Sequence, residues 1–127
     1  MAFSFENLEV YKKSIDWIQE AEELLCSIKG KISRSMEDQL SRAALSVSLN
    51  IAEGNGRWHK ADKRQFYWIA RGSTFECVPI LQVLLRKGLL DEIKYKSYYN
   101  LLEEMGKMLS GLIQSTERLE QGYSVGK

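Results

Sequence analysis

Six polar side chains recur at intervals of three and four residues between positions 39 and 57, and their types could act together. The set consists of Gln39, Arg42, Ser46, Asn50, Glu53 and Arg57. On a helix, residues three and four apart share a face, so opposite charges can pair and Asn50 can bridge them as both donor and acceptor. Two interpretations are open: a solvated face with weak ion pairs, or a partly buried network that fixes helix register or a subunit contact.

The predicted network also includes Ser73 and Glu76 from a later segment. Its carboxylates would pair with arginine or accept hydrogen bonds from asparagine and serine side chains. Losing one member of a buried network costs more than losing an exposed pair, because a desolvated partner is left unpaired. We predict that Arg42, Asn50, Glu53 and Glu76 are mostly buried and are hydrogen-bonded to one another or to the backbone.

Candidates for catalysis or metal binding are few. Glu53 and Glu76 could be paired carboxylates for general acid–base catalysis, but no nucleophile, phosphate-binding glycine loop or dinucleotide motif accompanies them. His59 is the only histidine, and Cys26 and Cys77 lie in other segments, so the sequence does not indicate a metal site. We expect a non-enzymatic protein without catalytic residues, metal or cofactor, whose two cysteines are buried, reduced thiols.

A cluster of basic and aromatic residues follows the polar stripe. It comprises Arg57, Trp58, Lys60, Lys63 and Arg64. Lysine and arginine contact phosphate, and tryptophan stacks on unpaired bases without reading their sequence. We take these five residues as a candidate binding site for RNA or single-stranded nucleic acid. The alternative is that basic residues near helix ends are only solvated.

The composition is that of one globular domain over residues 1–127. The chain is 44% hydrophobic and 28% charged, with a formal net charge of +1. A charge this close to zero excludes a general attraction to nucleic acid or anionic lipid, so any such binding must come from local patches. No signal-like start and no apolar run of about 18 residues is visible, so we expect a cytoplasmic protein with no membrane partner.

Apolar residues spaced three and four apart predict four amphipathic helices, at about residues 5–29, 35–55, 62–87 and 91–121. Ser4, Ser35 and Asp91 are candidate N-caps, and Gly30 and Gly88 are candidate C-terminal stops. In the last helix the main buried seam is predicted at Tyr98, Leu101, Met105, Met108, Leu112 and Leu119, widened by Leu102, Leu109, Ile113 and Thr116. Four helices with short connections favour an all-α, antiparallel, up-down-up-down bundle.

Two features complicate a simple bundle. Pro79 lies inside the third predicted helix, where it removes a hydrogen bond and costs about 3 kcal/mol unless the helix kinks. The chain also has more aromatic surface than one narrow core would hold, so we expect part of it to be exposed or used at a subunit interface. The residues concerned are Trp17, Trp58, Tyr67, Trp68 and Phe75.

The stretch QLSRAALSVSLNIAEGNGR at 39–57, followed by IARGSTFE at 69–76, resembles the four-helix-bundle family of bacterial 23S ribosomal RNA intervening-sequence proteins. The matching positions are Gln39, Arg42, Ala43, Ser46, Asn50, Ile51, Ala52, Glu53, Gly54, Gly56 and Arg57, then Ala70, Gly72, Ser73 and Glu76. The opening FENLEVYKKS is similar to the family's start. This chain departs from the family pattern in its short first connection, KGKISRSMED, and at Ser48 and Leu49, where a proline often precedes the asparagine.

The resemblance implies a closed antiparallel bundle that assembles as a homo-oligomeric ring, typically a pentamer, and that acts as an adaptor rather than a catalyst. A related branch, the accessory variability determinants of diversity-generating retroelements, binds a reverse transcriptase and nucleic acid. Expected partners are therefore further copies of this chain and RNA or a nucleoprotein. The alternative function is a protein-interaction scaffold without direct nucleic-acid contact.

Overall fold

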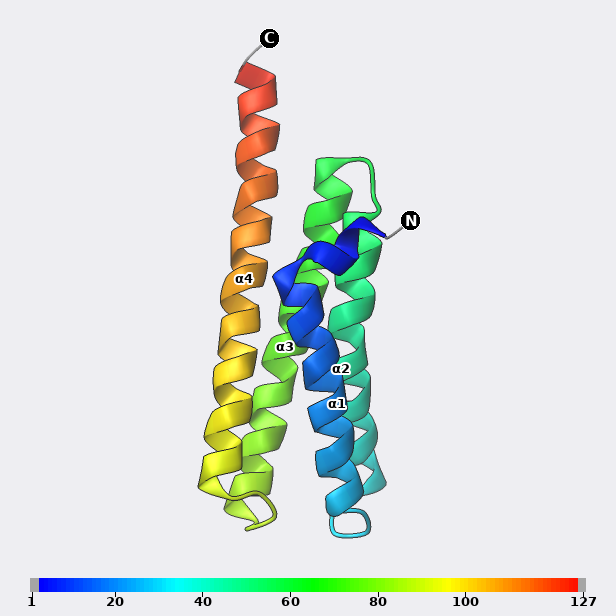
Figure 1. Cartoon of the computed structure of the whole chain (residues 1–127), viewed down its shortest axis with the longest axis vertical. Coiled ribbons are helices and arrows are strands. Elements are labelled where there is room, and N and C mark those ends of the chain that lie inside the picture. The colour runs from blue at the N-terminus through cyan, green and yellow to red at the C-terminus, as the bar shows by residue number, and fades with distance from the viewer. Residues whose placement is uncertain (1–2, 126–127) are drawn as a thin grey trace.

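The computed structural model describes residues 3–125, with side chains over residues 3–119. In that part of the chain, a short 3-10 helix, η1 (Ser4–Asn7), precedes four α-helices. These are α1 (Glu9–Ser27), α2 (Arg34–Asn55), α3 (Lys60–Arg86) and α4 (Glu92–Val125). Successive helices run in opposite directions, and α1 closes the bundle against α4 (Figure 1). The predicted all-α, up-down-up-down bundle is confirmed.

Several helix ends lie where the sequence predicts them. The connections after α1 and α3 each use a glycine in the left-handed region, Gly30 with φ of 83° and Gly88 with φ of 74°. At the start of α4, the Asp91 Oδ1 atom accepts a 2.8 Å hydrogen bond from the backbone N–H of Lys94. Asp91 is therefore the predicted N-cap, satisfying one of the donors that a helix start leaves free.

Other helix ends differ from the prediction. The N-cap of α2 is Ser33 rather than Ser35, because the Ser33 hydroxyl accepts the 3.2 Å hydrogen bond from the backbone N–H of Met36. Ser4 begins η1 instead of capping α1, and the extended backbone of Leu8 separates the two. Helix α3 begins at Lys60, two residues before the predicted start. Helix α4 continues past the predicted end at 121 and projects beyond the other helices (Figure 1).

The core follows the bundle axis and consists of large apolar side chains with almost no exposed surface. They include Trp17, Leu40, Ile51, Leu81, Leu84, Leu102, Met105 and Leu109. Burial of each stabilises the fold by about 1.5–3 kcal/mol. In α4 the fully buried line passes through Leu102, Met105 and Leu109, whereas Leu101 and Met108 are half-buried. The seam is therefore rotated from the predicted main stripe toward the residues expected only to widen it.

Helices α2 and α3 form the most extensive contact in the bundle, and Gly54 allows their close approach. A Cβ atom at Gly54 would lie 2.9 Å from Phe66 Cβ and 3.2 Å from the carbonyl oxygen of Lys63. Helix α3 continues through Pro79, which is exposed and lacks the N–H that would bond the Phe75 carbonyl. The α2–α3 contact therefore positions the surface residues of both helices relative to one another.

The aromatic residues divide between the core and the surface, as expected. Trp17 and Tyr67 are buried, whereas Trp58 is 88% exposed and Trp68 and Phe75 are about half exposed. The prediction for the cysteines is correct for Cys77, which is buried, and wrong for Cys26, which is exposed. Cys26 follows the buried Leu25 by one residue, and this step turns its side chain away from the core.

Candidate functional site

A chain of short hydrogen bonds joins three members of the predicted polar network. The Ser73 hydroxyl donates to the Ser46 hydroxyl at 2.9 Å, across the seam between α3 and α2. The Asn50 side-chain amide donates to the Ser46 hydroxyl at 3.0 Å and to the Ser46 carbonyl at 2.8 Å. These bonds satisfy small polar groups that the helix contact partly buries. The bond from Ser73 to Ser46 crosses between the helices and thus contributes to the register of α2 against α3.

The charged members of the predicted network do not join this seam. Arg42, Glu53 and Glu76 are exposed, so the prediction that they are mostly buried is wrong for the single chain. Glu53 pairs with Arg57 at 2.9 Å on the surface. Gln39, Arg42 and Glu76 make no side-chain hydrogen bond or ion pair within the part of the chain that the structure describes. The seam admits only short side chains, and the longer charged ones extend past it into solvent.

The exposed residues beside the seam form one continuous surface. Steps of three, four and seven residues from Ser46 on α2, and of three and four from Ser73 on α3, lead to side chains on the same side of each helix. Gly72 belongs to this side because it lies three residues after Ile69 and four before Glu76. We define the α2–α3 face as Arg42, Leu49 and Glu53 on α2 with Ile69, Gly72 and Glu76 on α3. Leu49 is 58% exposed and Ile69 is 45% exposed. The face therefore combines two exposed aliphatic side chains with charges of both signs.

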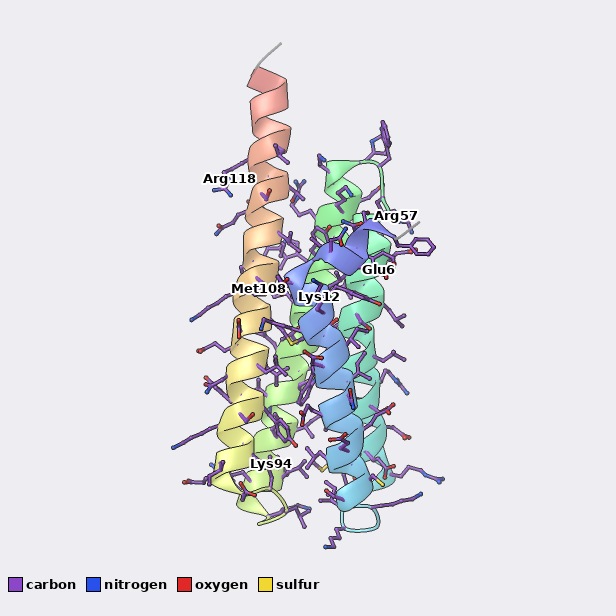
Figure 2. All side chains as sticks on the ribbon, in the orientation of Figure 1. Glu6, Lys12, Arg57, Lys94, Met108 and Arg118 are labelled. Atoms are coloured by element: carbon purple, nitrogen blue, oxygen red, sulfur yellow. The ribbon has the colours of Figure 1, made fainter. Side chains whose placement is uncertain are left out.

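The predicted nucleic-acid cluster lies at the connection between α2 and α3. Figure 2 shows Arg57 at this end of the bundle and Lys94 at the opposite end. Trp58 and Lys60 project into solvent. The Arg57 guanidinium, in contrast, lies 4.7 Å from the centre of the Phe66 ring and bonds to Glu53.

The remaining two cations of this cluster are less accessible. The Lys63 ammonium donates a 2.6 Å hydrogen bond to the carbonyl of Asn55, at the C-terminus of α2. Burial, and secondarily the nearby Lys60, lowers the pKa of Lys63. Arg64 is half-buried. The structure therefore brings the five predicted residues to one end of the bundle, but it leaves chiefly Trp58 and Lys60 open to a ligand.

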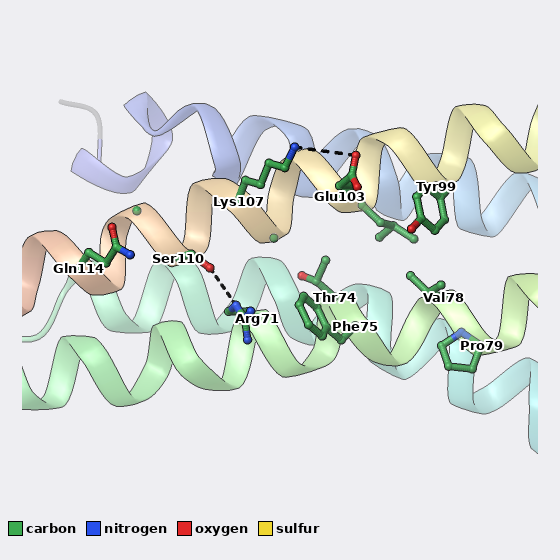
Figure 3. A pocket seen from close by; sticks show the side chains of 13 residues that line it. Arg71, Thr74, Phe75, Val78, Pro79, Tyr99, Glu103, Lys107, Ser110 and Gln114 are labelled. Atoms are coloured by element: carbon green, nitrogen blue, oxygen red, sulfur yellow. Dashed lines mark hydrogen bonds and ion pairs between the residues drawn. The ribbon is translucent and has the colours of Figure 1, made fainter.

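A groove between α3 and α4 is a further candidate that the sequence analysis missed (Figure 3). Its volume is about 650 Å³, and its lining includes Arg71, Phe75, Pro79, Gly106 and Gly111. In the sequence, the groove is marked only by two glycines five residues apart in the fourth predicted helix, Gly106 and Gly111.

Neither a cluster of metal-ligating side chains nor a membrane-spanning helix occurs among the described residues. No three histidine, cysteine, aspartate or glutamate side chains in residues 3–125 come together as ligands for a metal ion. None of the described helices combines the length and the apolar character that crossing a membrane needs.

Both the sequence and the fold of this chain are similar to those of known proteins. The sequence profile of the 23S rRNA-intervening sequence protein family matches residues 6–111. The structure is similar to a crystal structure from Bacteroides thetaiotaomicron of a protein with unknown function from the S23 ribosomal protein family. The two share 25% sequence identity and a TM-score of 0.76, over 82% of this chain and 97% of that chain. No curated protein matches the sequence. Because the family profile spans most of the bundle, the chain belongs to the 23S rRNA-intervening sequence protein family.

Proposed function

We propose that the protein is a non-enzymatic adaptor that assembles into a homo-oligomeric ring through its α2–α3 face. Five-fold symmetry is what the family resemblance implies. The same ring would present the α2–α3 connection of every subunit at one end, where Trp58 and Lys60 would bind single-stranded RNA. Each subunit's site is weak alone, and repetition around a ring raises the effective concentration of sites.

The observation that carries the proposal is that the α2–α3 face has exposed charged residues without partners in the described part of the chain and an open glycine, Gly72. The fold of one chain explains several motif residues: Ile51 is buried, Gly54 allows the helix approach, and Ser46 bonds to Ser73. It does not explain Arg42, Gly72 or Glu76. Arg42 and Glu76 have no partner among the described residues, and a Cβ atom at Gly72 would meet nothing within 4 Å. A second copy that binds to this face would give all three residues a role. Arg42 and Glu76 would pair with opposite charges of that copy, and Gly72 would allow its close approach.

Support for RNA binding comes from Trp58. A tryptophan that is 88% exposed loses the benefit of burial, and it offers a stacking platform for unpaired bases. Lys60 stands two residues away and can contact phosphate. The scaffold without nucleic-acid contact is the second candidate, and it is favoured by the engagement of Arg57 with Glu53 and of Lys63 with the Asn55 carbonyl.

Assembly is tested by the mass of the particle in solution. Multi-angle light scattering should give a multiple of the 14.6 kDa chain mass, five-fold for the expected ring. Ile69→Glu places an unpaired charge on the α2–α3 face and should release monomers, since desolvating that charge opposes association. Ile93→Glu is the matched control, because Ile93 is 84% exposed in the first turn of α4 and does not belong to the α2–α3 face. A wild-type monomer at micromolar concentration, or dissociation caused by both variants alike, would contradict the assembly.

RNA binding is tested on the assembled particle by fluorescence anisotropy with a labelled single-stranded RNA. Affinity should fall steeply with added salt and should be tolerant of base sequence. Trp58→Ala and Lys60→Glu should each weaken binding, while Lys94→Glu at the opposite end should leave it unchanged. An anisotropy of the RNA that does not change when wild-type particles are added at low salt would favour the scaffold without nucleic-acid contact.

A further inference from the structure

The groove between α3 and α4 has two chemically different walls. The α3 wall includes the apolar Phe75, Val78 and Pro79. The α4 wall carries the small residues Gly106, Ser110 and Gly111 among larger side chains such as Tyr99 and Leu102. Phe75 is 51% exposed along this wall. A volume of about 650 Å³ lies within the range of roughly 300–1,000 Å³ that small-molecule sites occupy.

The glycines of α4 keep the groove open. A Cβ atom at Gly106 would lie 3.2 Å from Phe75 Cε1, and one at Gly111 would meet nothing within 4 Å. Thr74 also lines the groove, but its hydroxyl already donates a 2.9 Å hydrogen bond to the Ala70 carbonyl of its own helix. The centre of the groove therefore offers mainly apolar surface.

Arg71 stands at one end of this apolar surface in a fixed orientation (Figure 3). Its Nε–H donates a 2.9 Å hydrogen bond to the Ser110 hydroxyl across the groove. Its guanidinium carbon lies 4.3 Å from the centre of the Phe75 ring and 5.4 Å from that of Trp68. The two terminal nitrogens make no hydrogen bond or ion pair with the residues that the structure describes. Their four N–H groups are thus held in place for an acceptor.

The charges around the groove leave Arg71 uncompensated. Glu103 and Lys107 line the same groove, and they lie 4.0 Å apart as a surface pair. They offset each other, so the lining carries one net positive charge, centred on Arg71. A planar guanidinium with its terminal edge free matches a carboxylate, which can accept two parallel hydrogen bonds.

We propose that the α3–α4 groove binds an amphipathic small-molecule carboxylate. The two oxygens of the ligand accept hydrogen bonds from the terminal nitrogens of Arg71, and its apolar body lies along Phe75, Val78 and Pro79. Arg71 and Pro79 are eight residues apart on one helix, so this body spans about 12 Å. That length corresponds to an unbranched chain of about ten carbons. The site lies within one subunit and goes beyond the proposed assembly and RNA binding.

The probe is decanoate, followed by ¹H–¹⁵N correlation spectra of the full chain, and decyltrimethylammonium serves as a probe with the same tail and the opposite charge. Decanoate should give saturable shifts centred on the Arg71 side-chain Nε–H and on the backbone of Phe75, Gly106 and Gly111. Arg71→Gln should weaken binding by roughly tenfold to a hundredfold, the usual contribution of hydrogen bonds to a charged group. Arg86→Gln, on the same helix but outside the groove, should leave the affinity unchanged.

A second pair of variants tests the groove itself. Gly111→Leu fills open space with a strong helix former, so the bundle stays folded and decanoate binding is lost. Gly72→Leu adds the same side chain at an open glycine on the α2–α3 face, and binding should persist whatever it does to assembly. Circular dichroism checks that both variants are folded.

Three results would overturn the proposal. Equal binding of both probes would show that the groove recognises only an apolar tail. Decanoate binding that survives Gly111→Leu would place the ligand elsewhere. Shifts of the groove residues that depend on protein concentration in the absence of decanoate would assign the groove to a second copy of the chain. Particle mass and RNA affinity, measured on the same samples, report separately on the proposed function.

Discussion

Gly54 packs directly against Phe66, so closely that a methyl group at Gly54 would lie 2.9 Å from the Phe66 Cβ atom. The added atom would also meet Tyr67 Cε1 at 3.0 Å and a backbone carbonyl at 3.2 Å, and the backbone contact cannot be relieved by turning a side chain. This contact sets how closely the end of α2 approaches the start of α3. It therefore sets the geometry of the connection that carries Trp58 and Lys60.

Gly54→Ala should lower the free energy of unfolding by about 1–3 kcal/mol, because the helices must move apart or distort. Gly111→Ala is the matched control, since its methyl group meets nothing within 4 Å and alanine favours the helix by about 0.5–1 kcal/mol. Urea denaturation of both variants measures the two effects. A Gly54→Ala protein as stable as the wild type would show that α2 and α3 leave room for a methyl group at this position.

Within a single chain, the hydrogen bond from Ser73 to Ser46 should contribute more to the free energy of unfolding than any charge on the α2–α3 face. Ser73→Ala should cost about 0.5–1.5 kcal/mol, because it removes a hydrogen bond from a partly buried seam. Glu76→Gln should change the stability of the monomer by less than about 0.5 kcal/mol, because Glu76 is exposed and has no partner among the described residues. A double-mutant cycle between Ser46→Ala and Ser73→Ala isolates the pairwise term, and additive effects would argue against the bond.

The buried thiol of Cys77 should make stability depend on alkaline pH. Burial raises the pKa of Cys77 from 9.0 to about 12. Hydrogen bonding with the Trp17 side chain lowers this pKa by a smaller amount, and the negative charge of Glu76 raises it further. The folded chain keeps this proton longer than the unfolded chain does. The stabilisation is therefore complete below pH 9 and is lost as the pH rises toward 12, by about 1.4 kcal/mol for each pH unit.

Comparison of the wild type with Cys77→Ala isolates this dependence. Burial also raises the pKa of Tyr67 and of Tyr98, which adds to the loss, and the lowered pKa of Lys63 opposes it. These groups remain in the variant, so the difference between the two urea-denaturation series reports on Cys77 alone. Parallel stability curves between about pH 8 and about pH 10.5 would mean that the thiol titrates normally in the fold.

The two cysteines should differ sharply in reactivity. Cys26 is exposed and Cys77 is buried, and neither forms a disulfide. A thiol reagent such as 5,5′-dithiobis(2-nitrobenzoate) should modify one thiol per native chain at neutral pH, and both in denaturant, because the reagent needs access to the sulfur. Mass spectrometry after digestion should locate the native adduct at Cys26. Rapid modification of Cys77 in the native protein would require a local opening that exposes the core.

The sequence predicts the four helices well because apolar spacing, glycine and aspartate act locally. Gly30, Gly88 and Asp91 end or begin helices through their own backbone and side-chain geometry, without help from distant residues. Spacing cannot distinguish Ser46, which lies in the α2–α3 seam, from Arg42, four residues earlier on the same stripe. That difference depends on the crossing of two helices, which Gly54 controls.

The candidate surfaces were predictable to different degrees for the same reason. The basic cluster is continuous in sequence, so its place at one end of the bundle followed from the helix order. The hydrogen bond from Lys63 to the Asn55 carbonyl could not be predicted from the helix order, because it depends on the turn between α2 and α3. The α3–α4 groove combines Arg71 with Gly106 and Gly111, which follow it in the sequence by 35 and 40 residues, and such a combination exists only once the helices have packed.

The order of the helices around the bundle has a consequence for how the chain folds. Each helix packs against the next one in sequence, so three of the four helix contacts join near neighbours along the chain. Only the contact between α1 and α4 requires closing a loop of most of the polypeptide, and it is the smallest of the four. A topology dominated by contacts of short sequence separation folds quickly, on the microsecond to millisecond scale. The α1–α4 edge should form last and open first, and its amides should exchange with solvent ahead of those between α2 and α3.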